Sequence, residues 1–342
     1  MISEFFVGAD FSIKDSMKQL DKTKGLGLIV VDKNKKLLGT LTDGDIRRAL
    51  TDTKFGLESS IESIYHQNPI SVGPDAGKEE LEKITSNKKI KIVPIVKDNV
   101  VIDVYTVGHE DTQGIPVVIM AGGLGSRLGE HTKKCPKPML KVAGKPVLER
   151  ILKNFTHVGF EKFFFSVNFL AEVIEEHFQD GKKFDCNIQY LRENKRLGTA
   201  GSLSLLPSNL EGPIIVTNGD LLTHVDFRRL INFHNQHQSL ITMCTRKYEF
   251  QVPFGVVNIK DALATGIDEK PTQSFNISAG LYVIDAKLLS YIPKDEYYDM
   301  PTFLEQLIEE KKDIHCFPLV EQWIDIGKID DLNLAREKYR DE

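Results

Sequence analysis

Cysteine and tryptophan are scarce in this sequence: its 342 residues include four cysteines and one tryptophan. No two cysteines form a C-x-x-C pair, so the spacing indicates neither a disulfide framework nor a zinc ribbon. Isolated reduced thiols are typical of proteins in reducing compartments, and we therefore expect a cytoplasmic protein. The four cysteines are Cys135, Cys186, Cys244 and Cys316.

Long apolar runs and an excess of positive charge are also missing. No run approaches the roughly 20 apolar residues that are needed to cross a bilayer. The opening MISEFFVGAD carries Glu4 and Asp10 and no basic residue, unlike a secretory signal. The formal net charge of −5 disfavours a general nucleic-acid binder. We expect neither a membrane nor a nucleic acid among the partners.

The length and composition fit a soluble protein of two domains. The chain is 41% hydrophobic and 27% charged, which is ordinary for globular proteins. A length of 342 residues exceeds a typical single domain. The polar stretch at 111–114, DTQG, ends in glycine and is a suitable linker. We predict one domain over 1–113 and a second over 114–342.

The N-terminal part contains two copies of one pattern. In the first copy a helical pattern at 13–20 precedes apolar strands at 28–31 and 37–41, and TDGD then leads into a helix. A helix at 79–84 and strands at 91–96 and 100–105 form the second copy. The pattern predicts an α+β domain. Thr42 and Asp45 also have the spacing of a helix capping box, which is a purely structural role.

A glycine-rich turn follows an apolar run at 117–120. Gly122, Gly123 and Gly125 come next, with Arg127 and Lys137 further along. Bare backbone N–H groups at the carboxyl end of a strand can hold phosphate, and the cationic side chains can add to this. The string fits neither the P-loop nor the dinucleotide fingerprint. A phosphate-binding loop and a plain chain reversal therefore remain open on the glycines alone.

A second strand, at 213–218, ends in Asn218-Gly219-Asp220. Strands alternate with helices from Pro116 onward, which predicts a mostly parallel α/β sheet. A carboxylate at the carboxyl edge of such a sheet, beside phosphates, suits Mg²⁺. An Asn-Gly-Asp turn that only ends the strand is the structural alternative.

The strings AGGLGSRL and PKPML together resemble the opening of the sugar-1-phosphate nucleotidylyltransferases. LGTAG, PIIVTNGD, PFGVV, EKP, NISAGLYV and WIDIGKIDDL extend the resemblance. It implies a Rossmann-like domain and transfer of a nucleotidyl group from an NTP to a sugar-1-phosphate, with release of pyrophosphate. GTP and a hexose- or hexosamine-1-phosphate, such as glucosamine-1-phosphate, are the implied substrates. Mannose-1-phosphate guanylyltransferases and cytidylyl- or thymidylyltransferases are alternatives of the same fold.

The same resemblance implies residue roles. Arg127 and Lys137 would act on the phosphates, and Asp220 and Asp325 would bind one Mg²⁺. The implied nucleotide-binding residues are Ala121, Gly122, Gly123, Gly125, Gly198, Thr199 and Asp220. The implied sugar-binding residues are Gly255, Glu269, Lys270 and Asn276.

The segment GLGLIVVDKNKKLLGTLTDGDIRRAL resembles the first half of a cystathionine-β-synthase (CBS) domain pair. Such pairs typically bind adenosine nucleotides, which implies that Thr42 and Asp45 face a ribose. In the second copy His109 replaces an expected aspartate and Asp103 replaces a glycine. The pair then binds a ligand in its first half only, or serves dimerisation in a homo-oligomer. A nucleotide sensor with an inactive transferase domain is the alternative function.

Overall fold

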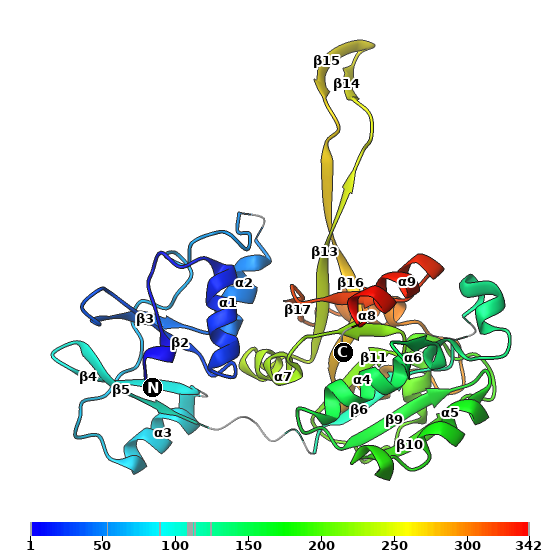
Figure 1. The fold of residues 1–342 in the computed structure, drawn as a ribbon, viewed down its shortest axis with the longest axis horizontal. Coiled ribbons are helices and arrows are strands. Elements are labelled where there is room, and N and C mark those ends of the chain that lie inside the picture. Colours follow the sequence, from blue (N-terminus) through cyan, green and yellow to red (C-terminus); the bar gives the residue numbers. More distant parts are fainter. Residues whose placement is uncertain are drawn as a thin grey trace.

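The computed structural model describes residues 2–52, 54–88, 90–107, 112, 114–123 and 125–340. His109 and the predicted domain boundary at residue 113 lie outside the described residues. The N-terminal half lies beside a larger body that carries a long projecting hairpin (Figure 1). No helix among the described residues is long and apolar enough to cross a membrane.

Both predicted copies of the N-terminal pattern are present. In the first copy α1 (Ile13–Lys22) packs near a three-stranded sheet of β1 (Phe6–Val7), β2 (Leu28–Val31) and β3 (Leu37–Leu41), and α2 (Asp43–Leu50) follows. The second copy contains α3 (Lys78–Lys88) and a hairpin of β4 (Ile92–Lys97) and β5 (Val100–Thr106). The α+β expectation for this half is confirmed.

The larger body is built on a seven-stranded sheet in the order β10-β9-β6-β11-β16-β13-β17. All of these strands run parallel except β16, which is antiparallel to both of its neighbours. The predicted mostly parallel α/β sheet is therefore confirmed. The strand bounds are β6 (Pro116–Met120), β9 (Lys162–Val167), β10 (Asn187–Arg192), β11 (Pro213–Asn218), β13 (Ile241–Gln251), β16 (Thr272–Asp285) and β17 (Ile314–Pro318).

Helices cover both faces of this sheet, which explains the unbroken apolar run of β6. Val117 and Ile119 pack in one hydrophobic cluster, whereas Val118 between them packs in the other. A strand that is buried on both faces needs no polar alternation. The first cluster includes side chains of α4 (Val147–Thr156), α5 (Ala171–Phe178), α7 (Phe227–Gln236) and α9 (Ile329–Lys338). The second includes α6 (Gly198–Gly201) and α8 (Met300–Glu309).

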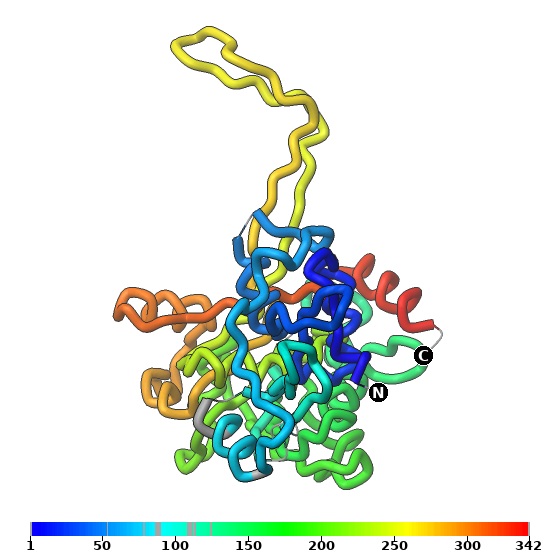
Figure 2. The backbone as a smooth tube through the Cα atoms, turned by 90° about the vertical axis from the view of Figure 1, so that its left-hand side faces the viewer, coloured from blue at the N-terminus to red at the C-terminus, as the bar shows by residue number. Residues whose placement is uncertain are grey.

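Strands β13 and β16 continue beyond the sheet as a two-stranded arm, whose end is formed by β14 (Val256–Lys260) and β15 (Leu263–Asp268). The arm projects away from the body in two perpendicular views (Figures 1 and 2). The sequence predicts three separate strands at 239–245, 254–259 and 278–284. The structure instead extends two of them into one ladder, because hydrogen bonding continues from Thr245↔Ser278 out to Gln251↔Thr272.

A buried ion-pair network joins the two halves of the protein. Arg47 on α2 is fully buried and donates to Asp43 and to Glu321 of the body, both at 2.7 Å. Its guanidinium also lies 3.8 Å from the centre of the Phe317 ring. Arg229 on α7 reaches back to Asp43 at 3.4 Å. Burial raises the pKa of Glu321, but Arg47 outweighs it and the net pKa is lowered.

His234 on α7 makes the stability of the protein dependent on pH. Burial lowers the pKa of this imidazole from 6.5 to about 4. The unfolded chain therefore takes up a proton below pH 6.5 that the folded chain accepts only near pH 4. Neutral His234 makes its full contribution to the free energy of unfolding above pH 6.5, and about 3 kcal/mol of that free energy is lost by pH 4. We expect urea unfolding at about pH 7 and about pH 4.5 to show this loss.

The variant His234→Gln tests this expectation, because glutamine does not titrate. Its loss of stability between the two pH values should be smaller than that of the wild type by about 2–3 kcal/mol. The exposed residue His131 provides the control, as His131→Gln. Equal pH dependence in the wild type and His234→Gln would contradict the prediction.

Candidate nucleotide and metal site

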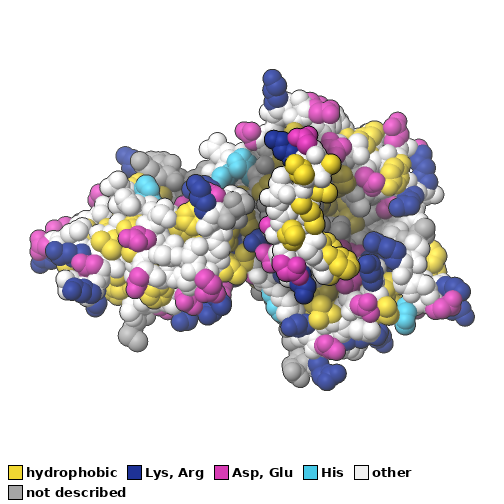
Figure 3. Space-filling view, turned by 90° about the horizontal axis from the view of Figure 1, so that it is seen from above, with side chains coloured by type: hydrophobic (Ala, Val, Ile, Leu, Met, Phe, Trp, Pro, Cys, Tyr) yellow, Lys and Arg dark blue, Asp and Glu magenta, His cyan; other side chains and the backbone are white. Residues whose placement is uncertain are grey.

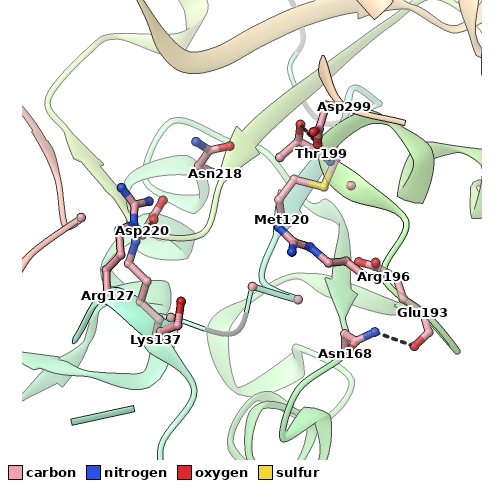
Figure 4. A pocket seen from close by; sticks show the side chains of 16 residues that line it. Met120, Arg127, Lys137, Asn168, Glu193, Arg196, Thr199, Asn218, Asp220 and Asp299 are labelled. Carbon is pink, nitrogen blue, oxygen red and sulfur yellow. Dashed lines mark hydrogen bonds and ion pairs between the residues drawn. The ribbon is translucent and has the colours of Figure 1, made fainter. Parts of the chain in front are cut away.

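A cavity of about 410 Å³ lies at the carboxyl ends of β6 and β11. Open α/β sheets bind ligands at this edge. Figure 4 shows the side chains that line it, with Arg127, Lys137 and Asp220 in one group and Thr199 and Asp299 in another. The lining residues are Met120, Gly122, Gly123, Gly125, Ser126, Arg127, Lys137, Asn168, Glu193, Arg196, Gly198, Thr199, Asn218, Asp220, Asp299 and Gly327.

The glycines of the loop after β6 meet two different needs. Gly125 has a φ of +63°, and a Cβ there would lie 3.0 Å from that of Lys137. A Cβ on Gly122 would lie 2.8 Å from a carboxylate oxygen of Glu193. Gly123 has no neighbour within 4 Å of such an atom, so its backbone is open to the cavity. Ala121 is buried and does not line the cavity.

Lys137 and Asp220 form an ion pair at one end of the cavity. The short 3-10 turn 137–139 begins after Pro136 and has proline as its second residue, so this segment is stiff. The Lys137 side chain is only 10% exposed and that of Asp220 21%. The lysine therefore brings a positive charge to the carboxyl end of β11 with little freedom to leave it.

Asp325 lies next to Asp220 although 105 positions separate them in the sequence. The two-stranded sheet of β12 (Leu221–Thr223) and β18 (Trp323–Asp325) pairs Leu221 with Asp325. The N–H of Ile326 also donates to the Asp220 carbonyl at 3.1 Å. The structure thus places both predicted metal ligands at one edge. Asp325 lines an adjoining cavity of about 230 Å³ together with Asn218, Ser278 and Trp323.

The charges of this pair suit a divalent cation. Burial first, and then the neighbouring Asp220, raise the pKa of Asp325, against the opposing effects of Lys137 and Arg127. A cation between the carboxylates would relieve their repulsion. Within the described part of the chain, no group of three or more His, Cys, Asp or Glu side chains could hold a metal. Two carboxylates plus substrate phosphates are what Mg²⁺ commonly uses.

The segment 197–203, which begins with the LGTAG string, forms the opposite wall. Gly198 has a φ of +83°, and a Cβ there would lie 2.7 Å from the carbonyl oxygen of Tyr298. Thr199 accepts a hydrogen bond from the N–H of Met300 at 2.9 Å, and its own N–H donates to Asp299 at 3.2 Å. Gly198 and Thr199, which the family resemblance assigns to the nucleotide, both line the cavity. Asp299 also lines the cavity, although no sequence pattern predicts it.

Glu193, another lining residue without a predicted role, holds this wall in place. Its carboxylate accepts from the hydroxyl of Ser166 at 2.6 Å and from the N–H of Leu197 at 3.0 Å. The amide of Asn168 donates to its carbonyl at 2.9 Å. These contacts link β9 to the turn that carries Gly198, which identifies Glu193 as a positioning residue. Only the tertiary contacts reveal this role.

The predicted sugar-binding residues do not reach the cavity of their own chain. Gly255, Glu269 and Lys270 lie at the outer part of the arm, and Asn276 lies on β16 opposite Lys247. None of the four lines this cavity or the adjoining one. The cause is the continuous β13–β16 ladder, which carries this segment away from the body. The assignment of the four residues to the sugar, which the family resemblance implies, stays a prediction.

Thr42 and Asp45 form the predicted capping box of α2. The N–H of Asp45 donates to the Thr42 hydroxyl at 3.2 Å, and the N–H of Thr42 donates to the Asp45 carboxylate at 2.9 Å. Both residues also line a cavity of about 540 Å³ between the N-terminal half and α7, together with Arg48 and His66. The structural role and an open ligand cavity coexist at this site.

Comparison with known proteins identifies the larger body. A family model described as nucleotidyl transferase matches residues 116–342. The chain belongs to the nucleotidyl transferase family. A CBS domain model matches residues 1–52, which covers the first copy of the N-terminal pattern.

Curated relatives of this nucleotidyl transferase act on sugar phosphates, according to their names. It is 30% identical over 234 residues to UTP–glucose-1-phosphate uridylyltransferase of Synechocystis, with 63% of this chain and 60% of the relative covered. It is 28% identical to mannose-1-phosphate guanylyltransferase of Mycobacterium tuberculosis, with 64% and 63% covered. This nucleotidyl transferase thus spans about three fifths of the length of the curated relatives that it matches.

Solved structures share the fold of this nucleotidyl transferase. HddC from Yersinia pseudotuberculosis is 27% identical with a TM-score of 0.53, and the match covers 66% of this chain and all but 1% of HddC. A putative glucose-1-phosphate thymidylyltransferase from Bacillus anthracis is 21% identical with a TM-score of 0.55, covering 67% and 96%. The sequence resemblance to sugar-1-phosphate nucleotidylyltransferases is confirmed at the level of the family.

Proposed function

We propose that this protein transfers a guanylyl group from GTP to a hexose- or hexosamine-1-phosphate, such as glucosamine-1-phosphate. The products are a nucleotide-sugar and pyrophosphate. The observation that carries the proposal is the meeting of Arg127 and Lys137 with two carboxylates, Asp220 and Asp325, at the open glycine loop. The names of the guanylyltransferase relatives and an HddC structure solved with GMP-PN support GTP among the nucleotides.

The proposed reaction is an in-line displacement at phosphorus. A phosphate oxygen of the sugar phosphate forms a bond to the α-phosphorus of GTP, and the bond to the β-phosphate oxygen breaks. Pyrophosphate leaves with the electron pair. No side chain forms a covalent intermediate, so positioning and charge neutralisation must supply the acceleration.

Each charged residue has a distinct part in this step. The backbone at Gly123 is open to the triphosphate, and Arg127 stabilises the negative charge that builds on the leaving pyrophosphate. Lys137 neutralises the reacting phosphates, and its pairing with Asp220 keeps both charges in place beforehand. Asp220 and Asp325 would hold Mg²⁺. This cation supplies Lewis-acid charge neutralisation when bound.

Pyrophosphate release by the purified full-length protein tests this function. GTP, CTP, UTP, dTTP and ATP are each combined with glucosamine-, mannose- and glucose-1-phosphate in the presence of Mg²⁺. We expect release with GTP and one of these sugar phosphates. Release with another base would keep the reaction and correct the nucleotide. Nucleotide binding without release from any pair would favour the alternative, a nucleotide sensor.

The four cysteines and the nucleotide substrate suit a reducing, cytoplasmic location.

A second proposal concerns the cavity that Thr42 and Asp45 line. We infer that it binds an adenosine nucleotide whose ribose faces Asp45. Arg48 and His66 line the same cavity.

Asp45→Ala should weaken binding of AMP, ADP or ATP at least about tenfold in calorimetry, because a ribose hydroxyl loses a charged acceptor. Ser12→Ala is the control. It removes the N-cap of α1 at a similar cost of about 1 kcal/mol without touching the cavity. Unchanged affinity in Asp45→Ala would contradict the ribose role.

A further inference from the structure

The inner part of the arm has one mostly apolar face and one polar face. Residues directly opposite in an antiparallel pair share a face of the ribbon. Tyr248 is opposite Phe275, and Phe250, two positions along the same strand, is opposite Gln273. We call these three residues the stalk patch, and each is about half exposed. The other face carries the pairs Lys247↔Asn276, Glu249↔Ser274 and Gln251↔Thr272.

A second apolar group lies at the end of the arm. Val257 is opposite Ile267, and both are exposed, as is Ile259 two positions further along. We call these three residues the tip patch. In the view from above, apolar side chains follow the projecting arm (Figure 3). Half of the exposed large hydrophobic side chains of the described residues lie on this hairpin.

The body does not cover either patch. No residue from 246 to 277 among those described belongs to a hydrophobic core cluster. A two-stranded ribbon is at best marginally stable in water without a covering layer. Contiguous exposed apolar surface of this kind marks an interaction site in soluble proteins. The arm is therefore built to be covered by something other than its own body.

The residues beside the tip patch point to the occupant. Glu269 and Lys270, which the family resemblance assigns to the sugar, lie beyond β16 at the outer end of the ladder. Ser278, on the same strand, lines the cavity beside the metal carboxylates. Ser278 is eight positions from Lys270 in the sequence, which corresponds to about 26 Å of extended strand. The arm thus removes this pair from its own site, and a second copy of the chain holds the equivalent site.

We propose that two copies of this chain pair through their stalk and tip patches, and that each arm brings Glu269 and Lys270 to the nucleotidyl site of the other copy. Such an interface is two-fold, so both copies contribute the same surface to it. The second part of the inference rests on the proposed function, because it supplies the sugar site of that reaction. The dimer itself does not depend on the reaction.

The area of the arm supplies part of a stable interface. One face from Arg246 to Lys260 is about 50 Å long and about 10 Å wide, which gives roughly 500 Å². A standard stable interface buries about 800 Å² on each partner. The arm faces alone fall short of that value. Contact of each tip with the body of the other copy, which delivery to its site requires, adds the missing area.

Two neighbouring residues on opposite faces allow a matched test of the dimer. Phe275→Lys places a charge in the stalk patch, whereas Ser274→Lys places the same charge on the polar face, opposite Glu249. Light scattering of the full-length protein should show a dimer for the wild type and for Ser274→Lys. Phe275→Lys should raise the dissociation constant at least about tenfold, as expected for a charge in an apolar interface. A monomeric wild type, or equal effects of the two variants, would overturn the proposal. If the wild type is monomeric and binds phosphatidylcholine–phosphatidylglycerol vesicles, the patches would be assigned to lipid instead.

Mixed dimers test the delivery of the tip. One chain carries Lys137→Ala and keeps its tip, and the other carries Glu269→Gln with Lys270→Ala and keeps its site. Each chain alone should be nearly inactive. An equal mixture should recover about a quarter of the wild-type activity, because half of the dimers are mixed and each of these has one complete site. No recovery, with an active wild type, would overturn the delivery and leave the reaction intact.

A crosslink gives a readout that needs no activity. A photoreactive amino acid replaces Lys270 in a mixture of unlabelled and isotope-labelled chains. We expect crosslinked peptides with mixed labels that contain Lys137 or Asp325. Crosslinks only within one label would show that the tip stays with its own chain and would overturn the proposal. An inactive wild type that gives mixed-label crosslinks would count against the proposed reaction and support the exchanged arms.

Discussion

Asp220→Asn should lower kcat/KM at least about 100-fold at fixed Mg²⁺ while leaving the protein folded. That loss corresponds to about 2.7 kcal/mol of transition-state stabilisation. Asparagine keeps the size of the side chain and an oxygen that can still accept from Lys137. It removes the charge that would hold a cation beside Asp325. Pyrophosphate release over a range of Mg²⁺ concentrations measures the effect, and we expect the apparent affinity for Mg²⁺ to fall as well.

Folding should survive this change because two electrostatic effects oppose each other. The Lys137 ammonium loses its charged partner, which costs stability. Asp325, whose pKa the Asp220 carboxylate helps to raise, loses a repulsive neighbour. Thermal unfolding should therefore change little. Glu211→Gln makes the same charge change in the exposed segment that precedes the first residue of β11. The activity of this control variant should match that of the wild type. Normal turnover in Asp220→Asn would contradict the metal assignment.

Arg47→Met should cost about 3–5 kcal/mol in the free energy of unfolding, the largest stability effect that we expect from one substitution. Methionine fills much of the space over the Phe317 ring but leaves Asp43 and Glu321 without their shared cation. Both carboxylates are largely buried, so they lose attraction without regaining full hydration. The single tryptophan, Trp323, is two positions from Glu321 and reports on this junction through its fluorescence during urea unfolding.

The neighbouring arginine provides the control. Arg48 follows Arg47 on α2, but its side chain is 63% exposed and lies 3.4 Å from Asp45. Surface pairs of this kind contribute about 0–1 kcal/mol, so Arg48→Met should be nearly neutral. Arg47→Lys should fall between the two, because lysine restores the charge without the planar fork of donors. Similar losses for Arg47→Met and Arg48→Met would show that the buried network is not what joins the halves.

Local patterns predict much of this fold from the sequence. The strands expected at 28–31 and 37–41 are β2 and β3 over the same residues, and the apolar run at 117–120 lies in β6. Periodicity and strand propensity act over a few residues, so they are readable without the tertiary structure. The glycine loop could be predicted for the same reason, because glycines mark positions where the backbone approaches a neighbour closely. Most of the predicted phosphate-side residues consequently line one cavity.

Contacts between distant segments could not be predicted in this way. Arg47 and Arg48 are adjacent on one helix. Nothing in the sequence around them predicts which of the two side chains is buried against the larger body. Glu193 and Asp299 gain their places only when β9 and α8 meet the turn at Gly198. The arm escaped prediction because alternating strands look the same inside a sheet and beyond its edge. Only the ladder register decides between these outcomes.

The continuous ladder of the arm also has a consequence for the order in which the chain folds. The turn at the tip first brings together Lys260 and Leu263, which are neighbours in sequence. Each pair further inward then closes a loop only slightly longer than the last, until Ile241 reaches Ile284 within the sheet. Loop-closure entropy grows slowly when it is taken in such steps. Two central strands that are distant in sequence are thereby aligned by a zipper of local closures rather than by a single long-range search.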